Sequence, residues 1–165
     1  AASATGEEVW SLAITACEMF DSLTPPVTIL ASDIDSHALK TAAAGVYSVA
    51  RMGLSPARLS RFFMVDTASQ QATVRPELQA LTRFARINLL DARWPVGELL
   101  GAPIEAIFCR NVMIYFDRPT QTAILGKFRP LLGAAGRLYA GHSEIFTHAV
   151  ELFKPLGRTV YAPAA

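Results

Sequence analysis

Residues 104–117 read IEAIFCRNVMIYFD, in which the mostly apolar run of residues 104–109 is followed directly by Arg110 and Asn111. Residues 104–109 are typical of a strand buried on both faces, as the strands of parallel sheets are. In open α/β sheets, ligands bind at the loops that leave the carboxyl ends of the strands. The stretch therefore predicts a buried strand that ends in a polar binding loop, although Arg110 and Asn111 could instead only cap that loop.

Strand and helix patterns alternate along the rest of the chain. Short apolar runs predict strands, and apolar residues at helical spacing predict helices, one of which has Ser36 and Gly45 as capping residues. The segments with the strand pattern are residues 27–32, 104–109, 136–141 and 158–162. The segments with the helix pattern are residues 7–20, 36–45, 55–63, 117–133 and 143–150. This alternation predicts an α/β fold with a largely parallel sheet.

The region between residues 64 and 87 interrupts this alternation. Residues 64–71 are mostly polar and predict a loop, whereas residues 73–75 and 80–88 have the pattern of two extended segments. We therefore expect a β-hairpin subdomain over about residues 64–87, inside a single domain of residues 1–165.

The composition indicates one soluble globular domain. The chain has 165 residues, of which 52% are hydrophobic and 18% are charged, so it can bury a core and is not disordered. A net charge of +1 without clustered basic residues does not favour nucleic-acid binding. No apolar run approaches the roughly 18 residues that a membrane helix needs, so direct membrane insertion is not expected.

The cysteine and histidine residues form no disulfide or metal pattern. Cys17 and Cys109 lie inside apolar segments, which favours buried, reduced thiols and a cytoplasmic location. His37, His142 and His148 are isolated in the sequence, so no metal site is expected.

The loop before the first predicted helix has the sequence SATGEE at residues 3–8. Its small residues let a ligand approach the backbone at a helix N-terminus, where free N–H groups are available. Glu7 and Glu8 disfavour an anion, so a neutral or cationic nucleoside suits the loop better. The alternative is an ordinary helix start that binds nothing.

Two further strand ends carry polar residues. Asp33 follows the strand of residues 27–32, in a position suited to binding both hydroxyls of a ribose. It could also be a simple cap, which is the role expected of Asp35. Asn88 could bind the edge of an adenine while Leu89 packs on its face.

Six motifs together resemble those of the CheR-type methyltransferases, which methylate glutamates on bacterial chemoreceptors. They occur in unbroken order over nearly the whole chain, and the longest of them is highly specific. The motifs are TGEE at 5–8, ASDID at 31–35, NLL at 88–90, IFCRNVMIYFD at 107–117, GHSE at 141–144 and TVYA at 159–162.

The resemblance implies a Rossmann-like S-adenosylmethionine-dependent methyltransferase fold with a small antiparallel β insert. It implies S-adenosylmethionine as methyl donor and S-adenosylhomocysteine as product. The implied acceptors are glutamates in the cytoplasmic domains of methyl-accepting chemotaxis receptors. Tyr115 corresponds to the tyrosine beside the reacting methyl group and is the expected catalytic residue. The residues that the resemblance assigns to the cofactor are Gly6, Glu7, Glu8, Asp33, Asn88, Leu89, Arg110 and Asn111.

This chemistry needs no general base. A glutamate carboxylate has a pKa of about 4.3, so it is ionised at neutral pH and can attack a sulfonium methyl group directly. The enzyme then contributes in-line positioning and the exclusion of water. The lack of a Ser-His-Asp or Cys-His pattern in the sequence is therefore consistent with an enzyme.

The chain departs from the family pattern in two places. The family's first strand and N-terminal helical domain have no counterpart, so we expect the chain to be an excerpt of a longer protein. Residues 64–71 contain no glycine where tether-binding members have several, so we expect no binding of the receptor's C-terminal pentapeptide. Two alternatives stay open: a methyltransferase of the same fold acting outside chemotaxis, and a non-catalytic module that binds the cofactor.

Overall fold

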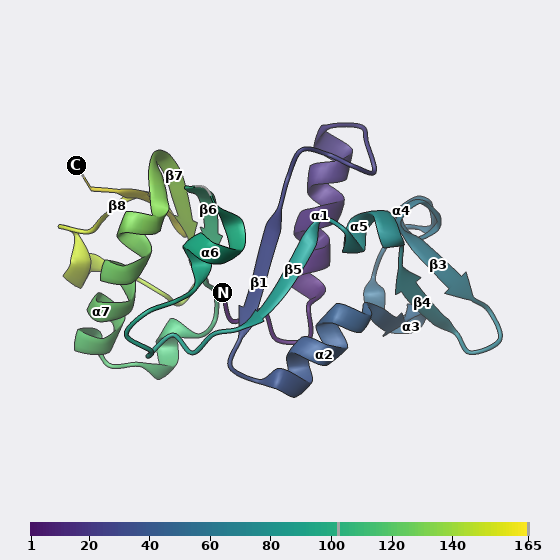
Figure 1. Ribbon diagram of the computed structural model, residues 1–165, viewed down its shortest axis with the longest axis horizontal. Helices are drawn as coiled ribbons and strands as arrows, with labels where there is room; N and C mark the ends of the chain where they lie inside the picture. Colours follow the sequence, from purple (N-terminus) through teal and green to yellow (C-terminus); the bar gives the residue numbers. More distant parts are fainter. Residues whose placement is uncertain (102, 165) are drawn as a thin grey trace. The chain divides into compact units, whose positions relative to one another are not determined.

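The computed structural model describes residues 1–101 and 103–164 (Figure 1). The chain divides into two compact units, each with its own buried core. The N-terminal unit is Ser3–Arg86, and the C-terminal unit is Ile87–Ala165 together with Ala1 and Ala2. In the described part of the chain, no helix combines the length and the apolar character that crossing a membrane requires.

The N-terminal unit is built on two parallel strands, β1 (Ile29–Asp33) and β5 (Thr82–Arg86). Their register pairs Ile29 with Thr82 at one end and Asp33 with Arg86 at the other. Two helices contact this pair of strands, α1 (Glu7–Met19) and α2 (Ser36–Ala44) (Figure 1). Because the strands are parallel, Asp33 lies at the carboxyl end of both.

The ends of α2 agree with the local sequence. The Asp35 carboxylate accepts hydrogen bonds from the backbone N–H groups of His37 (2.7 Å) and Ala38 (3.2 Å), so Asp35 is the N-cap. Gly45 ends the helix with a φ of 61°, a left-handed conformation that glycine adopts at little cost. The expected cap role of Asp35 is therefore confirmed, whereas the expectation that Ser36 is the N-cap is wrong, because Ser36 is the first residue of the helix.

A small antiparallel sheet is inserted between α2 and β5. Its strands are β2 (Val46–Ser48), β3 (Phe63–Asp66) and β4 (Gln71–Val74), in the order β2-β4-β3. Three short helices flank these strands in the sequence: α3 (Val49–Met52), α4 (Pro56–Phe62) and α5 (Pro76–Gln79). The expectation of a small antiparallel insert is confirmed.

Two of the predictions for this region are wrong. Residues 64–71, expected to be a loop, contain most of β3 and the turn of the hairpin. Residues 80–88 contain β5, which pairs in parallel with β1 rather than completing a hairpin. Met64 and Val65 are 46% and 42% exposed and only Phe63 of β3 is buried, so the strand has no alternating pattern in its sequence.

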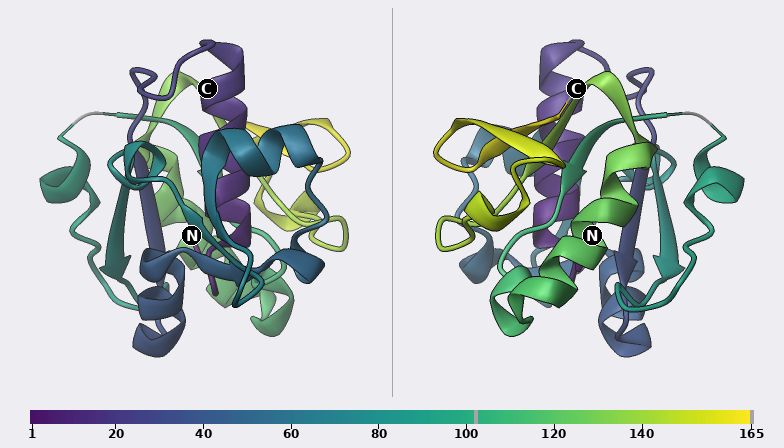
Figure 2. Two further views of the ribbon diagram at one scale, coloured as in Figure 1. Left: turned by 90° about the vertical axis from the view of Figure 1, so that its right-hand side faces the viewer. Right: turned by 90° about the vertical axis from the view of Figure 1, so that its left-hand side faces the viewer.

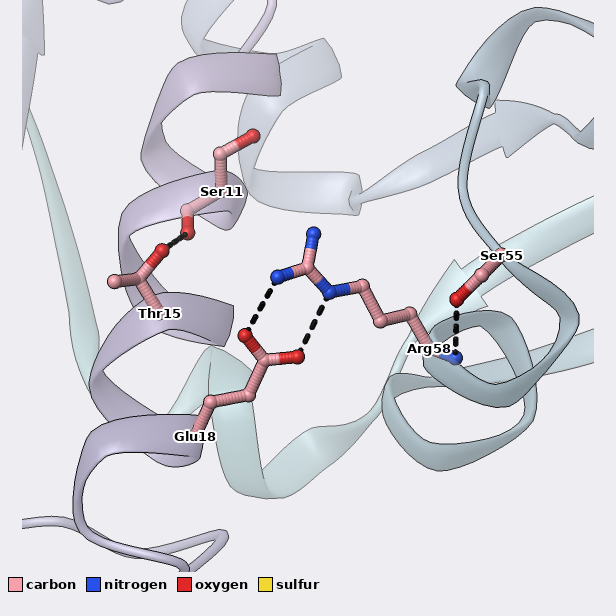
Figure 3. Close-up of polar contacts among 5 residues, drawn as sticks. All are labelled: Ser11, Thr15, Glu18, Ser55 and Arg58. Carbon is pink, nitrogen blue, oxygen red and sulfur yellow. Dashed lines mark hydrogen bonds and ion pairs between the residues drawn. The ribbon is translucent and has the colours of Figure 1, made fainter.

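Two ion pairs join the insert to the C-terminal end of α1. Figure 3 shows Arg58 of α4 donating from Nε and Nη2 to the two carboxylate oxygens of Glu18, at 2.7 Å each. Arg61 binds Asp21 at 2.9 Å. The hydrogen bond from Arg58 lowers the pKa of the Glu18 carboxyl. Both pairs face solvent, so they orient the insert more than they stabilise it.

The C-terminal unit contains a four-stranded sheet in the order β6-β7-β9-β8. Strands β6 and β7 are parallel, whereas β9 runs antiparallel to both β7 and β8. The four strands are β6 (Ile104–Phe108), β7 (Leu132–Tyr139), β8 (Phe153–Gly157) and β9 (Val160–Pro163).

Helix α7 (Arg118–Phe128) provides one side of this unit's core (Figure 2). Asp117 caps it by accepting a hydrogen bond from the Thr120 backbone N–H at 3.0 Å. Ile124, Leu125 and Phe128 are buried on its inner face, as the helical spacing predicts. The short helix α6 (Val96–Leu100) precedes β6.

Two helix predictions in this unit need correction. Helix α7 does not continue to Gly133: it ends at Phe128, and a 3-10 turn, η2 (Arg129–Leu131), follows. Pro130 explains this because it has no N–H to donate and disfavours a helical conformation at the residue before it. The helix expected over residues 143–150 is also wrong, since only Thr147–Ala149 form a 3-10 turn, η3.

Candidate functional site

In the N-terminal unit, the loop that leads into α1 is bonded to the end of β1. The backbone N–H of Ser3 donates to the Ser32 carbonyl at 2.9 Å, and that of Ala4 donates to Asp33 Oδ2 at 2.8 Å. Asp33 Oδ1 accepts from the Asp35 N–H at 2.9 Å. The Asp33 carboxylate is thus fixed in place while half-buried, and each oxygen has capacity to accept a further hydroxyl donor.

Gly6 makes the turn from this loop into α1. Its φ is 94°, and a Cβ atom there would lie 2.7 Å from the Ala42 Cβ and 3.0 Å from the Tyr47 hydroxyl. The loop therefore packs directly on α2 and β2. On its open side, the Thr5 hydroxyl donates to the Glu7 carboxylate at 2.7 Å.

Tyr47 of β2 holds the same loop and is a functional candidate that sequence reasoning missed. Its phenol donates to the Thr5 carbonyl at 2.7 Å. Burial, followed by the charge of Glu7, raises the pKa of Tyr47 to about 12. The phenol therefore remains a hydrogen-bond donor far above neutral pH. A single tyrosine in a three-residue strand gives no sequence signal for such a contact.

Tyr47→Phe is expected to lower the free energy of unfolding by about 1 kcal/mol at pH 8, because the Thr5 carbonyl loses its donor. The folded-state pKa of about 12 lies above the ordinary value of 10.0, so this stabilisation is full below pH 10 and is lost as the pH rises toward 12. The difference in stability between wild type and variant should shrink over that range. Urea unfolding followed by circular dichroism measures it, and a constant difference would contradict the prediction.

In the C-terminal unit, Arg110 and Asn111 lie in the turn that follows β6. The Cys109 N–H donates to the Tyr139 carbonyl at 2.9 Å, so β6 and β7 stay paired up to this turn. Asn111 is exposed and has a left-handed φ of 58°. A Cβ on Gly141 would lie 3.0 Å from the Asn111 nitrogen, so the segment after β7 packs against the turn. The turn after β6 and the segment after β7 both lie at the carboxyl ends of parallel strands, where α/β sheets bind ligands.

Tyr115 lies on the 3-10 turn η1 (Met113–Tyr115) that continues from these residues. Met113 is 1% exposed and anchors the turn in the core, whereas Tyr115 is 79% exposed. Its neighbour Ile114 lines a cavity of about 310 Å³ together with Arg118 and His148. The tyrosine is therefore presented on a fixed turn with its side chain accessible.

Asn88 and Leu89 lie on a loop that Lys127 of α7 holds. Lys127 Nζ donates to the carbonyls of Leu89 (2.5 Å) and Asp91 (2.7 Å) and lies 4.4 Å from the ring centroid of Trp94. Burial lowers the pKa of Lys127. Leu89 is only 8% exposed and its side chain belongs to the core. Lys127 and Trp94 are site-supporting residues that the sequence pattern did not reveal.

The residues that the resemblance assigns to the cofactor fall into two sets. The N-terminal set surrounds one loop and comprises Gly6, Glu7, the half-buried Glu8 and Asp33. The C-terminal set comprises Asn88, Leu89, Arg110 and Asn111, with Tyr115 as the catalytic candidate. The N-terminal set offers the fixed carboxylate of Asp33 beside small residues, and the C-terminal set offers the side-chain amides of Asn88 and Asn111 and the guanidinium of Arg110. Among residues 1–101 and 103–164, no three potential metal ligands gather.

Comparison with known proteins adds independent information. The family model described as "CheR methyltransferase, SAM binding domain" matches residues 1–162. Chemotaxis protein methyltransferase 2 of Pseudomonas aeruginosa is 50% identical over 99% of this chain and 58% of its own length. The chemotaxis protein methyltransferases of Salmonella typhimurium and Escherichia coli are 44% and 43% identical, each over 98% of this chain and 56% of their own length.

The chain thus spans a little over half the length of these curated relatives. A solved glycopeptide N-methyltransferase in complex with S-adenosylhomocysteine aligns over 91% of this chain and 58% of its own, at 12% identity and a TM-score of 0.37. That likeness is too distant to support an argument.

Proposed function

Because this chain belongs to the CheR methyltransferase family and matches its S-adenosylmethionine-binding domain, we propose that it methylates glutamate side chains of chemoreceptors. The products are glutamate methyl esters and S-adenosylhomocysteine. The chain has the family's Rossmann-like methyltransferase fold with a small antiparallel insert. The observation that carries the proposal is the 43–50% identity to chemotaxis methyltransferases over 98–99% of the chain.

Each set of site residues has a proposed part in binding the donor. Asp33 accepts hydrogen bonds from the ribose hydroxyls. The loop at Gly6 lets the nucleoside approach the backbone, and Glu7 and Glu8 lie toward the positively charged sulfonium group. Asn88 and the backbone of Leu89 contact the adenine, since the Leu89 side chain belongs to the core. The proposed contacts to the methionine end are Arg110 and Asn111. The bonds that already fix Asp33 support this assignment, because a preorganised group loses little freedom on binding.

The proposed reaction is a direct displacement at the methyl group. S-adenosylmethionine, when bound, supplies an electrophilic methyl group on a sulfonium. The incoming glutamate is ionised at neutral pH, so the protein needs no base. The proposed role of Tyr115 is to orient the carboxylate or the methyl group, and its 79% exposure on a fixed turn supports this role.

The proposed location is the cytoplasm, and the proposed partners are the cytoplasmic domains of methyl-accepting chemotaxis receptors. Residues 1–165 are proposed to act as one catalytic domain. The family match and the names of the relatives support this setting. The test is to incubate the intact protein with receptor cytoplasmic domains and radiolabelled S-adenosylmethionine. We expect base-labile methyl groups on the receptor. Transfer only to other proteins would favour a methyltransferase outside chemotaxis, and no transfer or binding would leave the proposal without support.

We further propose that the protein does not use the receptor's C-terminal pentapeptide as a tether. The hairpin turn at residues 66–70 contains no glycine, and Asp66 stiffens it by accepting from the Ala68 N–H (2.9 Å) and the Ser69 hydroxyl (2.7 Å). Side chains along the turn keep a peptide backbone from coming close as an added strand. Calorimetric titration with the pentapeptide is expected to give no heat. Micromolar affinity would contradict the prediction.

A further inference from the structure

The turn after β6 is held by the carboxylate of Glu144, the last residue of the GHSE motif, to which the sequence assigned no role. Its side chain is 3% exposed and lies in the C-terminal unit. Glu144 Oε1 accepts from the backbone N–H groups of Val112 (2.9 Å) and Met113 (2.8 Å). Its Oε2 accepts from those of Asn111 (3.0 Å) and Gly141 (2.5 Å). One side chain therefore binds four backbone donors from two separate segments.

These four donors explain why a charged group is buried here. A buried carboxylate is costly unless hydrogen bonds replace its water, and bonds to an ionised acceptor are stronger than neutral ones. The three consecutive N–H groups at residues 111–113 point to one place because Asn111 has a left-handed φ of 58°. Without Glu144, the buried N–H of Met113 and the partly buried N–H groups of Asn111 and Val112 would lose their acceptor.

Neighbouring residues hold the backbone of Glu144 in turn. The Tyr161 phenol donates to the Glu144 carbonyl at 3.3 Å, and the Glu144 N–H donates to the Gly141 carbonyl at 3.1 Å. A Cβ on Gly141 would lie 2.8 Å from Glu144 Oε2, so only glycine leaves room for the carboxylate. This compact turn replaces the helix expected from residue 143 onward.

The turn continues directly into the residues assigned to the donor and the reaction. Arg110 precedes the three bonded N–H groups and Asn111 is the first of them. The Tyr115 N–H donates to the Val112 carbonyl at 3.2 Å, which places η1 on the same scaffold. A shift of the turn would therefore move Arg110, Asn111 and Tyr115 together.

We propose that Glu144 is a positioning residue for methyl transfer: it fixes the turn of residues 110–113 and thereby aims the side chains that bind the methionine end of the donor. This inference rests on the proposed function of Arg110 and Asn111. Glu144 itself does not contact the donor. It acts through the backbone of the turn.

The ionised carboxylate cannot be replaced by its neutral isostere. Each Glu144 oxygen accepts two N–H groups. In Glu144→Gln, either orientation of the amide points an NH₂ group at two backbone donors and loses both bonds. A matched control is Phe153→Leu, because Phe153 is fully buried in the core of the same unit but lies on β8, outside the turn.

The test combines two measurements on the intact protein at a temperature where all variants are folded. Amide hydrogen exchange reports the anchoring of residues 111–113, and calorimetry with S-adenosylhomocysteine reports donor-site affinity. For Glu144→Gln, we expect exchange at these amides and the dissociation constant each to rise about tenfold or more. For Phe153→Leu, we expect lower thermal stability with an affinity within about threefold of wild type.

Gly141→Ala provides a second route if Glu144→Gln does not fold, since its Cβ would lie 2.8 Å from Glu144 Oε2 and 3.0 Å from the Asn111 backbone nitrogen and so would force the carboxylate and the turn apart. It should show the same two changes. Unchanged exchange, or faster exchange with unchanged affinity, would overturn the positioning role and leave the proposed function intact. Failure of the wild-type protein to bind S-adenosylhomocysteine would instead overturn the proposed function, and the positioning role with it.

Discussion

Asp33→Ala is expected to abolish measurable binding of S-adenosylhomocysteine, with a loss of affinity of about 100-fold or more. The proposed contacts are two hydrogen bonds from ribose hydroxyls to an ionised carboxylate, each worth about 1.5–3 kcal/mol. The variant also frees the Ala4 N–H, which Asp33 Oδ2 binds at 2.8 Å, so the loop before α1 loses part of its support. Isothermal titration calorimetry on the intact protein measures the change.

Asp35→Ala is the matched control for this variant. Asp35 lies two residues away and also binds backbone N–H groups, those of His37 and Ala38. Because Asp35 is the N-cap of α2, its replacement should lower the free energy of unfolding by about 1 kcal/mol. Its affinity for S-adenosylhomocysteine should stay within about threefold of wild type. Equal losses of affinity in the two variants would mean that Asp33 acts through the fold alone.

Gly6→Ala is expected to lower the free energy of unfolding by roughly 3 kcal/mol and to weaken donor binding as well. Its φ of 94° is strained for any other residue, and the new Cβ would lie 2.7 Å from the Ala42 Cβ on α2. Backbone strain and overpacking each cost about 1–3 kcal/mol. The loop must move away from α2 to relieve the contact, and Asp33 is bonded to that loop.

Gly53→Ala separates these two causes. Gly53 also has a positive φ, of 60°, but a Cβ there would meet nothing within 4 Å. The variant therefore reports backbone strain alone, about 1 kcal/mol. Chemical denaturation of both variants gives the comparison. If Gly6→Ala costs no more than Gly53→Ala, the close packing of the loop on α2 does not matter for stability.

Sequence patterns placed several elements well, but the expectation that residues 104–109 form a strand buried on both faces is wrong: in β6, Glu105 and Ala106 are exposed and only Ile107 is buried. The helices α1 and α7 and the strands β1, β6 and β9 fall where apolar spacing placed them, to within a few residues. The elements that were missed, β3 and β8, have weaker strand signals in the sequence. Strand β8 includes Lys154, Pro155 and Gly157 among its five residues, and β3 is only four residues long and directly follows α4, so neither gives a clear strand pattern.

The helix expected over residues 143–150 failed for a different reason. Ser143 has the chemistry of an N-cap, but the Glu144 carboxylate that follows is committed to four backbone donors from two segments. Contacts between residues more than 30 positions apart are not visible in local patterns. The same holds for Tyr47 with Thr5 and for Lys127 with Leu89, which are 42 and 38 positions apart.

The candidate site was predictable to the extent that its residues stand at strand ends. Asp33, Arg110 and Asn111 follow buried strands, and their chemistry could be argued from position. The residues that hold these side chains in place could not be predicted, because the supporting residues come from the inserted sheet, from α7 and from the segment after β7. Sequence therefore identified the proposed ligand contacts and missed their supports.

The hydrogen bond from Tyr47 to the Thr5 carbonyl has a thermodynamic consequence. It connects the first strand of the insert to the loop before α1 at 2.7 Å. Any ligand that displaced β2 would change the affinity of that loop for the donor by some factor. By reciprocity, the donor would change the affinity for that ligand by the same factor. The insert and the loop are therefore energetically linked through one phenol, and Tyr47→Phe would remove this connection.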